Sequence, residues 1–277
     1  MNRLREVSLA GVAQAINDAF DRHANTMDDV DRNEDLLSYK LIGAIRRVLE
    51  DPSEQERQLG SQSGFYVAIQ AYKATGRLEQ QHGDIAIVVT DLDHHLSGAG
   101  FYEAKAESHD GLYPSYKMRQ LRRLESSTPH LAVAMYERQA KAVNDNAYDA
   151  SLGCCSSGEA HQLRYCRVLP ATWVRQFSRL EAAASKMMPT SFGHHFVTRY
   201  LLGRDLDFSR NSLDAIDRWV RVTRRALPVV LEVVISRNPD SQYTSDPLGI
   251  LPGSDLAELD TIEYTPLVLK PSTKESI

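Results

Sequence analysis

Two segments of this sequence hold charged side chains that could act together in catalysis. Asp84 opens the run 84–90, which is β-branched and apolar and therefore predicts a buried strand. Glu103 and Lys105 lie two residues apart in the run 101–107, which predicts a second strand. Residues two apart on a strand share a face, so we expect the Glu103 carboxylate and the Lys105 ammonium to point the same way.

The chemistry that these groups indicate is metal-assisted hydrolysis of a phosphodiester. Neighbouring carboxylates repel each other unless a cation compensates them, and oxygen ligands from Asp and Glu favour Mg²⁺ or Mn²⁺. Lys105 beside such an ion would orient or deprotonate an attacking water, or stabilise charge that develops on a phosphate. A hairpin turn over 91–100 brings Asp84 to this pair only if the two strands bend apart or pair in an offset register.

The wider sequence predicts the elements that must position these residues. Apolar spacing and capping residues predict helices over 8–20, 36–49, 115–124, 171–185 and 213–226. Strands are predicted over 84–90, 101–107, 131–136, 163–169 and 229–236, and 65–72 fits either a strand or a short helix. This order indicates an α/β (α+β) protein with a central mixed sheet flanked by helices. The chain after 238 is predicted to be loop.

The strand that Asp84 opens and the following motif Glu103-Ala104-Lys105 together resemble the PD-(D/E)XK nuclease superfamily, which has the restriction-endonuclease-like fold. The resemblance covers roughly residues 30–170. It implies that Asp84 and Glu103 hold the metal ion. It also implies that Lys105 acts on the attacking water or on the phosphate.

Further positions match the same family. Glu34, at the start of the predicted second helix, matches an acidic residue that assists in metal binding. Gln120, and with it Lys117, match a helix position that supplies a side chain near the site, and Gly83 stands where the family often has a proline. Simpler explanations stay open, because Glu34 also suits the positive end of a helix and Gln120 also suits a solvated helix face. The Glu-x-Lys pair also fits a surface ion pair.

The resemblance implies a Mg²⁺- or Mn²⁺-dependent endonuclease that acts on nucleic acid, with DNA as the expected substrate. It further implies a homodimer that cuts one strand per subunit, and a role in bacterial defence against phage or plasmids. Two alternatives stay open. One is a catalytically silent nuclease-like module that binds nucleic acid or a protein, and the other is an effector active only with a partner such as a helicase or a sensor.

The net charge of −5 is distributed unevenly, which is compatible with a local nucleic-acid-binding surface. Residues 1–60 hold 8 basic and 12 acidic side chains, whereas 164–225 hold 12 basic and 5 acidic. Two predicted helices supply the candidate nucleic-acid contacts, which are Lys117, Arg119, Arg122, Arg123, Arg221 and Arg225. The two later arginines equally fit a solvated face paired with Asp214 and Asp217.

Other clusters of His and Cys fit simpler explanations than a metal site. One pair falls in the predicted hairpin turn, a cysteine set lacks the C-x₂-C spacing typical of zinc sites, and a last pair lies between phenylalanines. These clusters are His94 and His95; Cys154, Cys155, His161 and Cys166; and His194 and His195.

Domain organisation and compartment follow from length and composition. Residues 1–170 are expected to form the N-terminal helices and the nuclease core, and 171–277 an extension packed on it as one compact domain. Three cysteines, an odd number, argue against a disulfide framework and favour the cytoplasm. The longest apolar stretch, 228–235, is short and is interrupted by Glu232, so no membrane span is expected.

Overall fold

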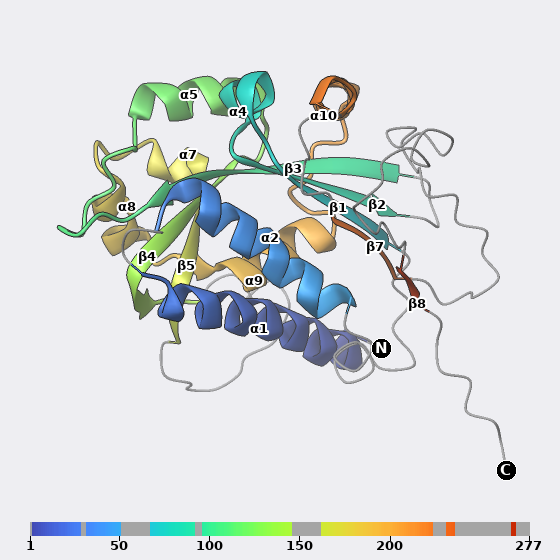
Figure 1. The fold of residues 1–277 in the computed structure, drawn as a ribbon, viewed down its shortest axis with the longest axis horizontal. Helices are drawn as coiled ribbons and strands as arrows, with labels where there is room; N and C mark the ends of the chain where they lie inside the picture. Colours follow the sequence, from blue (N-terminus) through green and yellow to red (C-terminus); the bar gives the residue numbers. More distant parts are fainter. Residues whose placement is uncertain are drawn as a thin grey trace, which may run out of the picture.

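A mostly antiparallel β-sheet forms the centre of the molecule, and helices cover both of its faces (Figure 1). The computed structural model describes residues 2–28, 32–50, 67–91, 96–145, 162–223, 231–235 and 267–269. Over these residues the mixed α/β class expected from the sequence is confirmed.

The sheet has eight strands in the described part of the chain, in the order β6-β5-β4-β3-β2-β1-β7-β8. Their bounds are β1 Val67–Lys73, β2 Ile85–Asp91, β3 Leu96–Ala106, β4 Ala132–Ala142, β5 Leu163–Pro170, β6 Thr190–Ser191, β7 Leu231–Ile235 and β8 Leu267–Leu269. Only β3 with β4 and β7 with β8 pair in parallel. Because parallel neighbours need a crossover, the helix α5 (Met118–Ser127) connects β3 to β4.

The remaining helices divide between the two faces of the sheet. One face carries α1 (Asn2–Thr26), α2 (Glu34–Glu50), α9 (Phe192–His195) and the π-helical segment η2 (Phe196–Leu201). The other carries α4 (Gly76–His82), α5, α7 (Ala171–Val174), α8 (Leu180–Met187) and α10 (Arg210–Thr223). Among these described helices, none has both the length and the apolar character needed to cross a membrane.

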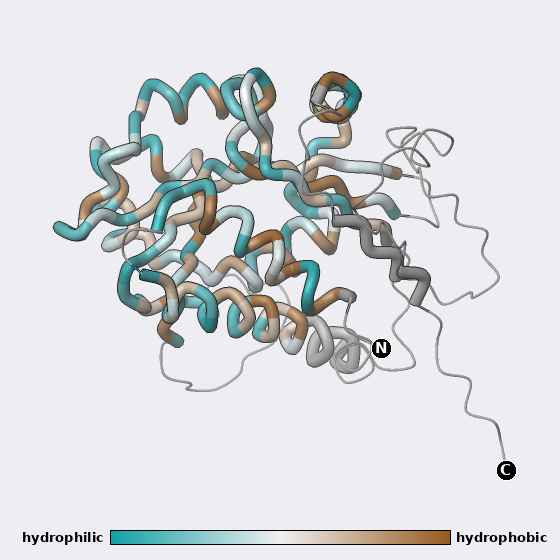
Figure 2. Tube along the Cα trace, viewed as in Figure 1, coloured by the Kyte–Doolittle hydropathy of each residue, from teal (hydrophilic) through white to brown (hydrophobic). Residues whose placement is uncertain are grey.

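The strand β2 contributes to two hydrophobic cores because successive side chains alternate between the faces of the sheet. Ile85 and Ile87 pack in the core on the side of α1 and α2, and Ala86 and Val88 pack in the core on the side of α4 and α5. Burial on both faces explains why this strand is an almost continuous apolar run. Figure 2 shows the contrast with α5, whose outer surface is largely hydrophilic.

The single helix predicted over 171–185 is wrong, because the segment forms two helices, α7 and α8. At the break, the Tyr116 hydroxyl donates to the backbone carbonyls of Phe177, at 3.1 Å, and of Val174, at 3.4 Å. Carbonyls that a continuous helix would pair internally therefore bond to another part of the chain. Local apolar spacing cannot show this tertiary contact.

Five described elements were not predicted, and one ambiguous segment is now assigned. The unpredicted elements are α4, β6, α9, η2 and β8. The segment predicted as strand or helix is the strand β1. The helix α4 has only seven residues, with Leu78 its one buried apolar side chain, so no apolar period indicates it. The loop predicted after 238 is wrong at Leu267–Leu269, where β8 pairs with β7, since three residues are too few to show alternation.

Candidate functional site

The register of the β2–β3 hairpin places Asp84 opposite Glu103. Ile85 pairs with Tyr102, and the Asp84 N–H donates to the Tyr102 carbonyl at 2.8 Å, which continues the ladder by one residue. Directly opposite residues of an antiparallel pair share a face. The predicted need for a bend or an offset register is therefore wrong, because β3 simply extends beyond the start of β2 in regular register.

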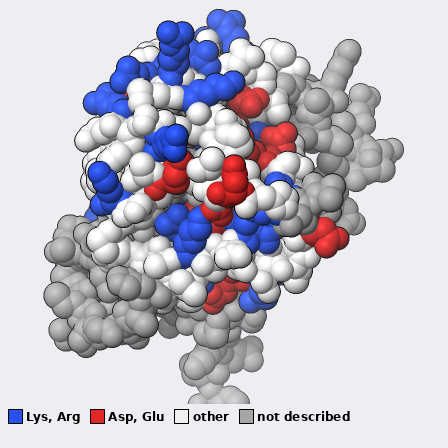
Figure 3. Space-filling view, turned by 90° about the vertical axis from the view of Figure 1, so that its left-hand side faces the viewer, with Lys and Arg blue, Asp and Glu red and all other residues white. Residues whose placement is uncertain are grey.

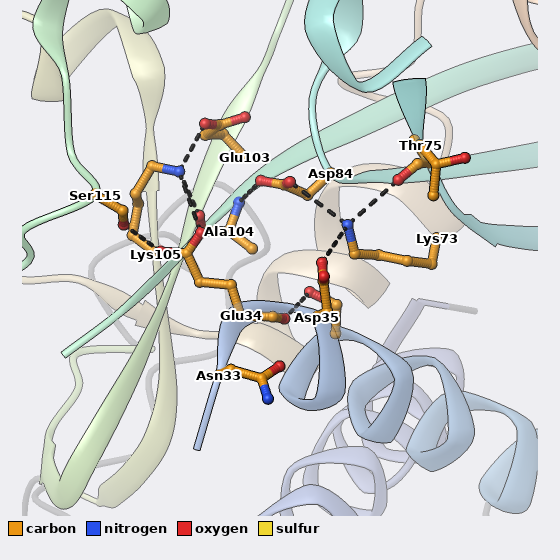
Figure 4. Close-up of polar contacts among 12 residues, drawn as sticks. Asn33, Glu34, Asp35, Lys73, Thr75, Asp84, Glu103, Ala104, Lys105 and Ser115 are labelled. Atoms are coloured by element: carbon orange, nitrogen blue, oxygen red, sulfur yellow. Dashed lines mark hydrogen bonds and ion pairs between the residues drawn. The ribbon is translucent and has the colours of Figure 1, made fainter. Parts of the chain in front are cut away.

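The free edge of β3 beyond β2 is capped by two carboxylates (Figure 4). The Ala104 N–H donates to Asp84 Oδ2 at 2.7 Å, and the Ala106 N–H donates to Glu34 Oε1 at 3.2 Å. These alternate N–H groups point to the side where β2 has ended, so without the carboxylates they would lack a partner. The backbone of β3 thus fixes the side chains of Asp84 and Glu34 along one line.

Gly83 allows the chain to enter β2 at this position. Its φ is +122°, and a Cβ here would lie 2.8 Å from the Tyr102 carbonyl oxygen. Its N–H also closes α4 by donating to the Glu79 carbonyl at 3.0 Å. Proline, with φ held near −65°, could not adopt this conformation. Glycine is therefore suited to this position, and proline is not.

Glu103 and Lys105 point from β3 toward α5 and form the centre of the site. Both are buried, with exposed fractions of 2% and 4%. Glu103 Oε1 lies 2.7 Å from Lys105 Nζ and accepts a hydrogen bond from Gln120 Nε2, also at 2.7 Å. Glu103 Oε2 is buried and has no hydrogen-bond partner among the described residues. One oxygen of this carboxylate is therefore left for a further ligand.

The charges of the site act on each other strongly. Burial, together with the neighbouring negative charge of Asp84, raises the pKa of Glu103 to about 8, although Lys105 acts in the opposite direction. Burial alone would lower the pKa of Lys105, but the charges of Glu103, Glu34 and Asp84 outweigh it and the pKa is raised. Lys105 therefore stays protonated and acts as a fixed cation rather than as a base at neutral pH.

Glu34 is held against Lys105. Its Oε2 lies 3.7 Å from Lys105 Nζ, and its Oε1 accepts hydrogen bonds from the Ser115 hydroxyl and the Ala106 N–H. The first turn of α2 thus reaches the site, as the resemblance implied, whereas the expected part of Glu34 in metal binding stays a prediction. In this arrangement Glu34 contacts the cation of the site and the edge of β3.

A second lysine, which the sequence analysis did not identify, lies on the other side of Asp84. Lys73, the last residue of β1, is buried, and its Nζ lies 3.0 Å from Asp35 Oδ1 and 3.6 Å from Asp84 Oδ1 (Figure 4). Burial would lower the pKa of Lys73, but the charges of Asp84 and Asp35 raise it. The one available signal was position, since Lys73 continues the face of Ile69 and Ala71, which are core residues.

Asp84 and Glu103 are the two carboxylates of the site that could hold a metal ion. No group of three or more His, Cys, Asp or Glu side chains suited to a metal ion occurs in the described ranges. Mg²⁺ binds through one or two carboxylates and completes its shell with waters or substrate phosphates. The paired carboxylates, one with an unpartnered buried oxygen, fit such an ion.

Basic side chains of α5 lie beside this site. A surface pocket of about 340 Å³ is lined by Lys117, Arg119, Gln120 and Arg123, and Gln120 is the residue that donates to Glu103. The cations of this helix and of its N-cap residue are exposed, and over the residues that the structure describes none of them forms an ion pair; they are Lys117, Arg119, Arg122 and Arg123. Figure 3 shows Lys and Arg gathered at the top of this face, above acidic side chains.

The other predicted contacts are placed differently. Arg221 Nε lies 2.7 Å from Asp217 Oδ1 within α10, which is the alternative that the sequence left open. Arg225 falls outside the described residues, as do His94, His95, Cys154, Cys155 and His161. Cys166 is buried and has no disulfide.

The histidine pair 194–195 belongs to the core. His194 and His195 are both buried, and His195 Nδ1 lies 2.9 Å from the Tyr102 hydroxyl. Burial lowers the pKa of His195 to about 3, so this ring is neutral at physiological pH. The packing role that the sequence indicated fits this environment.

Comparison with protein-family models, curated proteins and solved structures finds no match for this chain. The chemistry of the site therefore has to be inferred from its own groups. These are two opposed carboxylates, a protonated lysine between two acids, and an adjacent exposed basic helix. Such a set can bind a divalent cation and compensate the charge of a phosphate.

Proposed function

We propose that this protein is a Mg²⁺- or Mn²⁺-dependent endonuclease with a restriction-endonuclease-like core, a member of the PD-(D/E)XK superfamily. The observation that carries the proposal is the convergence of Asp84, Glu103 and Lys105 on one end of the β2–β3 hairpin. These three residues come from the two segments whose sequence resembles that family. Glu103 Oε2, which is buried and has no hydrogen-bond partner among the described residues, supports the proposal of a bound ligand. A buried oxygen without a hydrogen-bond donor costs free energy unless a ligand binds to it.

Each group of the site has a role that follows from its contacts. Asp84 and Glu103 would hold the metal ion, which when bound supplies positive charge at the phosphate and an activated water. Lys105, held by Glu103 and Glu34, directs its ammonium at the same place and stabilises charge that develops on the phosphate. Gln120 donates to Glu103 and keeps the carboxylate oriented. The Glu34 carboxylate keeps Lys105 in position.

The exposed basic helix favours nucleic acid as the substrate. Lys117, Arg119 and Arg123 surround a pocket that Gln120 joins to Glu103, so a phosphate held there lies next to the reacting centre. We propose DNA as the first substrate to test. A homodimer and a role in defence against phage or plasmids are parts of the proposal that rest on the family resemblance. A cytoplasmic location is a part that rests on the cysteine count.

The test is cleavage of supercoiled plasmid DNA and of a structured RNA by the purified full chain with Mg²⁺ or Mn²⁺. Wild type should convert the plasmid to nicked and linear forms, while Glu103→Ala and Lys105→Ala should leave it intact. EDTA should abolish the wild-type reaction. Equal behaviour of wild type and both variants on DNA and on RNA would contradict the catalytic assignment.

The site also has a feature that favours a second candidate, a catalytically silent module that binds nucleic acid. Lys73 and Lys105 lie beside Asp84 and Glu103, so each of these carboxyl groups has a cation next to it without a metal ion. Calorimetric titration with Mn²⁺ separates the two candidates. Absence of Mn²⁺ uptake together with salt-sensitive DNA binding would favour the silent module. If cleavage appears only with an added helicase or sensor, the protein is instead an effector that a partner activates.

A further inference from the structure

Two lysines of the site have the same pattern of contacts. Lys105 bridges Glu103, on the hairpin, and Glu34, at the start of α2. Lys73 bridges Asp84, also on the hairpin, and Asp35, the next residue of α2. Each of the two carboxylates that we propose as metal ligands therefore forms an ion pair with a buried lysine. The two adjacent acids of α2 provide each cation with a second partner.

Lys73 differs from Lys105 in how it shares its charge. Its Nζ is closer to Asp35, at 3.0 Å, than to Asp84, at 3.6 Å. Lys105 has the opposite preference, with Glu103 at 2.7 Å and Glu34 at 3.7 Å. Lys73 Nζ also donates to the Ala74 carbonyl at 3.3 Å, which anchors it away from Asp84. If Asp84 binds another cation, the Lys73 ammonium therefore still has two partners, Asp35 and the Ala74 carbonyl.

Lys73 is the cation that these two ion pairs place between Asp35 and Asp84. Without Lys73, no ammonium would separate the Asp84 carboxylate from the Asp35 carboxylate. Asp84 would then bind a divalent ion more strongly.

We propose that Lys73 is a built-in counter-ion of Asp84 that competes with the divalent metal ion and so sets the metal concentration at which the site fills. This inference rests on the proposed function, since it concerns the same metal site. Lys73 acts through Asp84 and is a positioning residue. When the ion binds, Lys73 retains Asp35 and the Ala74 carbonyl, and Asp84 exchanges one cation for another.

The test is calorimetric titration of Mn²⁺ into the full chain for wild type, Lys73→Met, Lys73→Arg and Lys141→Met. Lys141 is a matched control, because it also bridges two carboxylates, Glu107 and Glu137, at another place on the sheet. Removal of one positive charge beside the ion should tighten Mn²⁺ binding on the order of tenfold for Lys73→Met. Lys73→Arg and Lys141→Met should bind Mn²⁺ as wild type does.

A second variant keeps the test independent of how well Lys73→Met folds. The Asp35 side chain is 75% exposed, so Asp35→Asn should fold, and its loss leaves Lys73 to pair with Asp84 alone. Mn²⁺ should then bind more weakly, about threefold, and this weakening should shrink when Lys73→Met is also present. An equal weakening in both backgrounds would mean that Asp35 acts only through its own charge, which overturns the proposal.

The outcomes also separate this inference from the proposed function. Wild-type cleavage and Mn²⁺ uptake with unchanged or weaker binding by Lys73→Met would overturn the competition while leaving the nuclease intact. No Mn²⁺ uptake by wild type would overturn both. Tighter binding by Lys73→Met, with a lower Mn²⁺ concentration for half-maximal cleavage, would support both.

Discussion

Glu103 and Glu107 lie four residues apart on the same face of the chain that forms and follows β3, and their electrostatic environments are opposite. The pKa of Glu103 is raised to about 8 by burial and by the charge of Asp84. Burial also acts on Glu107, but bonds from Lys141 and from the Arg138 N–H outweigh it and lower the pKa. Both carboxyl groups are buried, so burial does not explain why the pKa of Glu103 is raised and that of Glu107 is lowered.

The difference lies in how completely each carboxylate is satisfied. Both oxygens of Glu107 accept hydrogen bonds, one from Lys141 and one from the Arg138 N–H. Its neighbour Glu137 accepts from Arg167 Nε at 2.6 Å through Oε1, and Glu137 Oε2 lies 2.7 Å from Lys141 Nζ. Glu103 Oε2 instead has neither a hydrogen bond nor an ion pair with a described residue. A closed ion network leaves nothing for a ligand, whereas an incomplete one is suited to bind one.

The largest expected effect separates the two glutamates by activity. Glu103→Gln should lower the cleavage rate by about 10³-fold, because the amide cannot compensate a metal ion or hold Lys105 in the same way. Glu107→Gln should leave the rate within a few-fold of wild type. The measurement is plasmid nicking under single-turnover conditions. Equal losses of cleavage rate for Glu103→Gln and Glu107→Gln would contradict the assignment of Glu103, and not Glu107, to the active site.

The ion network of Glu107, Glu137, Lys141 and Arg167 should contribute more to the free energy of unfolding than Glu103 does. Glu137→Gln leaves the buried Arg167 guanidinium without its ionic partner and should lower the free energy of unfolding by about 3 kcal/mol. Glu103→Gln should cost less, because burial already disfavours the charged form of Glu103. Urea unfolding followed by circular dichroism gives both values. A larger loss for Glu103→Gln would reverse the comparison.

The pH dependence of stability should have opposite signs for the two glutamates. Because the folded pKa of Glu103 is raised from 4.5 to about 8, the native state keeps a proton that the unfolded chain releases. This contribution to stability is present below pH 4.5 and is lost as the pH rises toward 8. The lowered pKa of Glu107 stabilises the fold above the unfolded value and is lost as the pH falls.

Thermal unfolding between pH 3 and pH 9 tests these signs. Relative to wild type, the melting temperature of Glu103→Gln should rise as the pH increases from 4.5 toward 8. Relative to wild type, the melting temperature of Glu107→Gln should fall as the pH increases toward 4.5 and should then stay constant. The same slope for both variants would show that the two carboxylates titrate alike.

The smallest effect concerns the basic residues around the site. Arg119→Ala and Arg123→Ala should each weaken DNA binding several-fold and lower the slope of log K against log salt by about 1. Arg221→Ala should change binding less, since Arg221 is paired with Asp217. Fluorescence anisotropy across a salt series gives the slopes. An equal slope change at Arg221 would extend the binding surface to α10.

Much of the site could be predicted from local patterns. The alternation of β3 places Glu103 and Lys105 on one face, and the apolar strand after Asp84 predicts the hairpin partner. The family resemblance, rather than a local pattern, implied that Gln120 lies near the site, and Gln120 donates to Glu103. Lys73 could not be identified from the sequence, because its partners Asp35 and Asp84 belong to other segments of the chain.

The sequence by itself determined the fold class, the two central strands and the identity of the central acids and lysine, because strand period and apolar runs are local properties. Only the tertiary structure decided which charges are compensated. The register brings Asp84 opposite Glu103, the packing of α2 supplies Glu34 and Asp35, and the end of β1 supplies Lys73. Electrostatic energy depends on distances between groups from different elements, and these distances arise only when the core is packed.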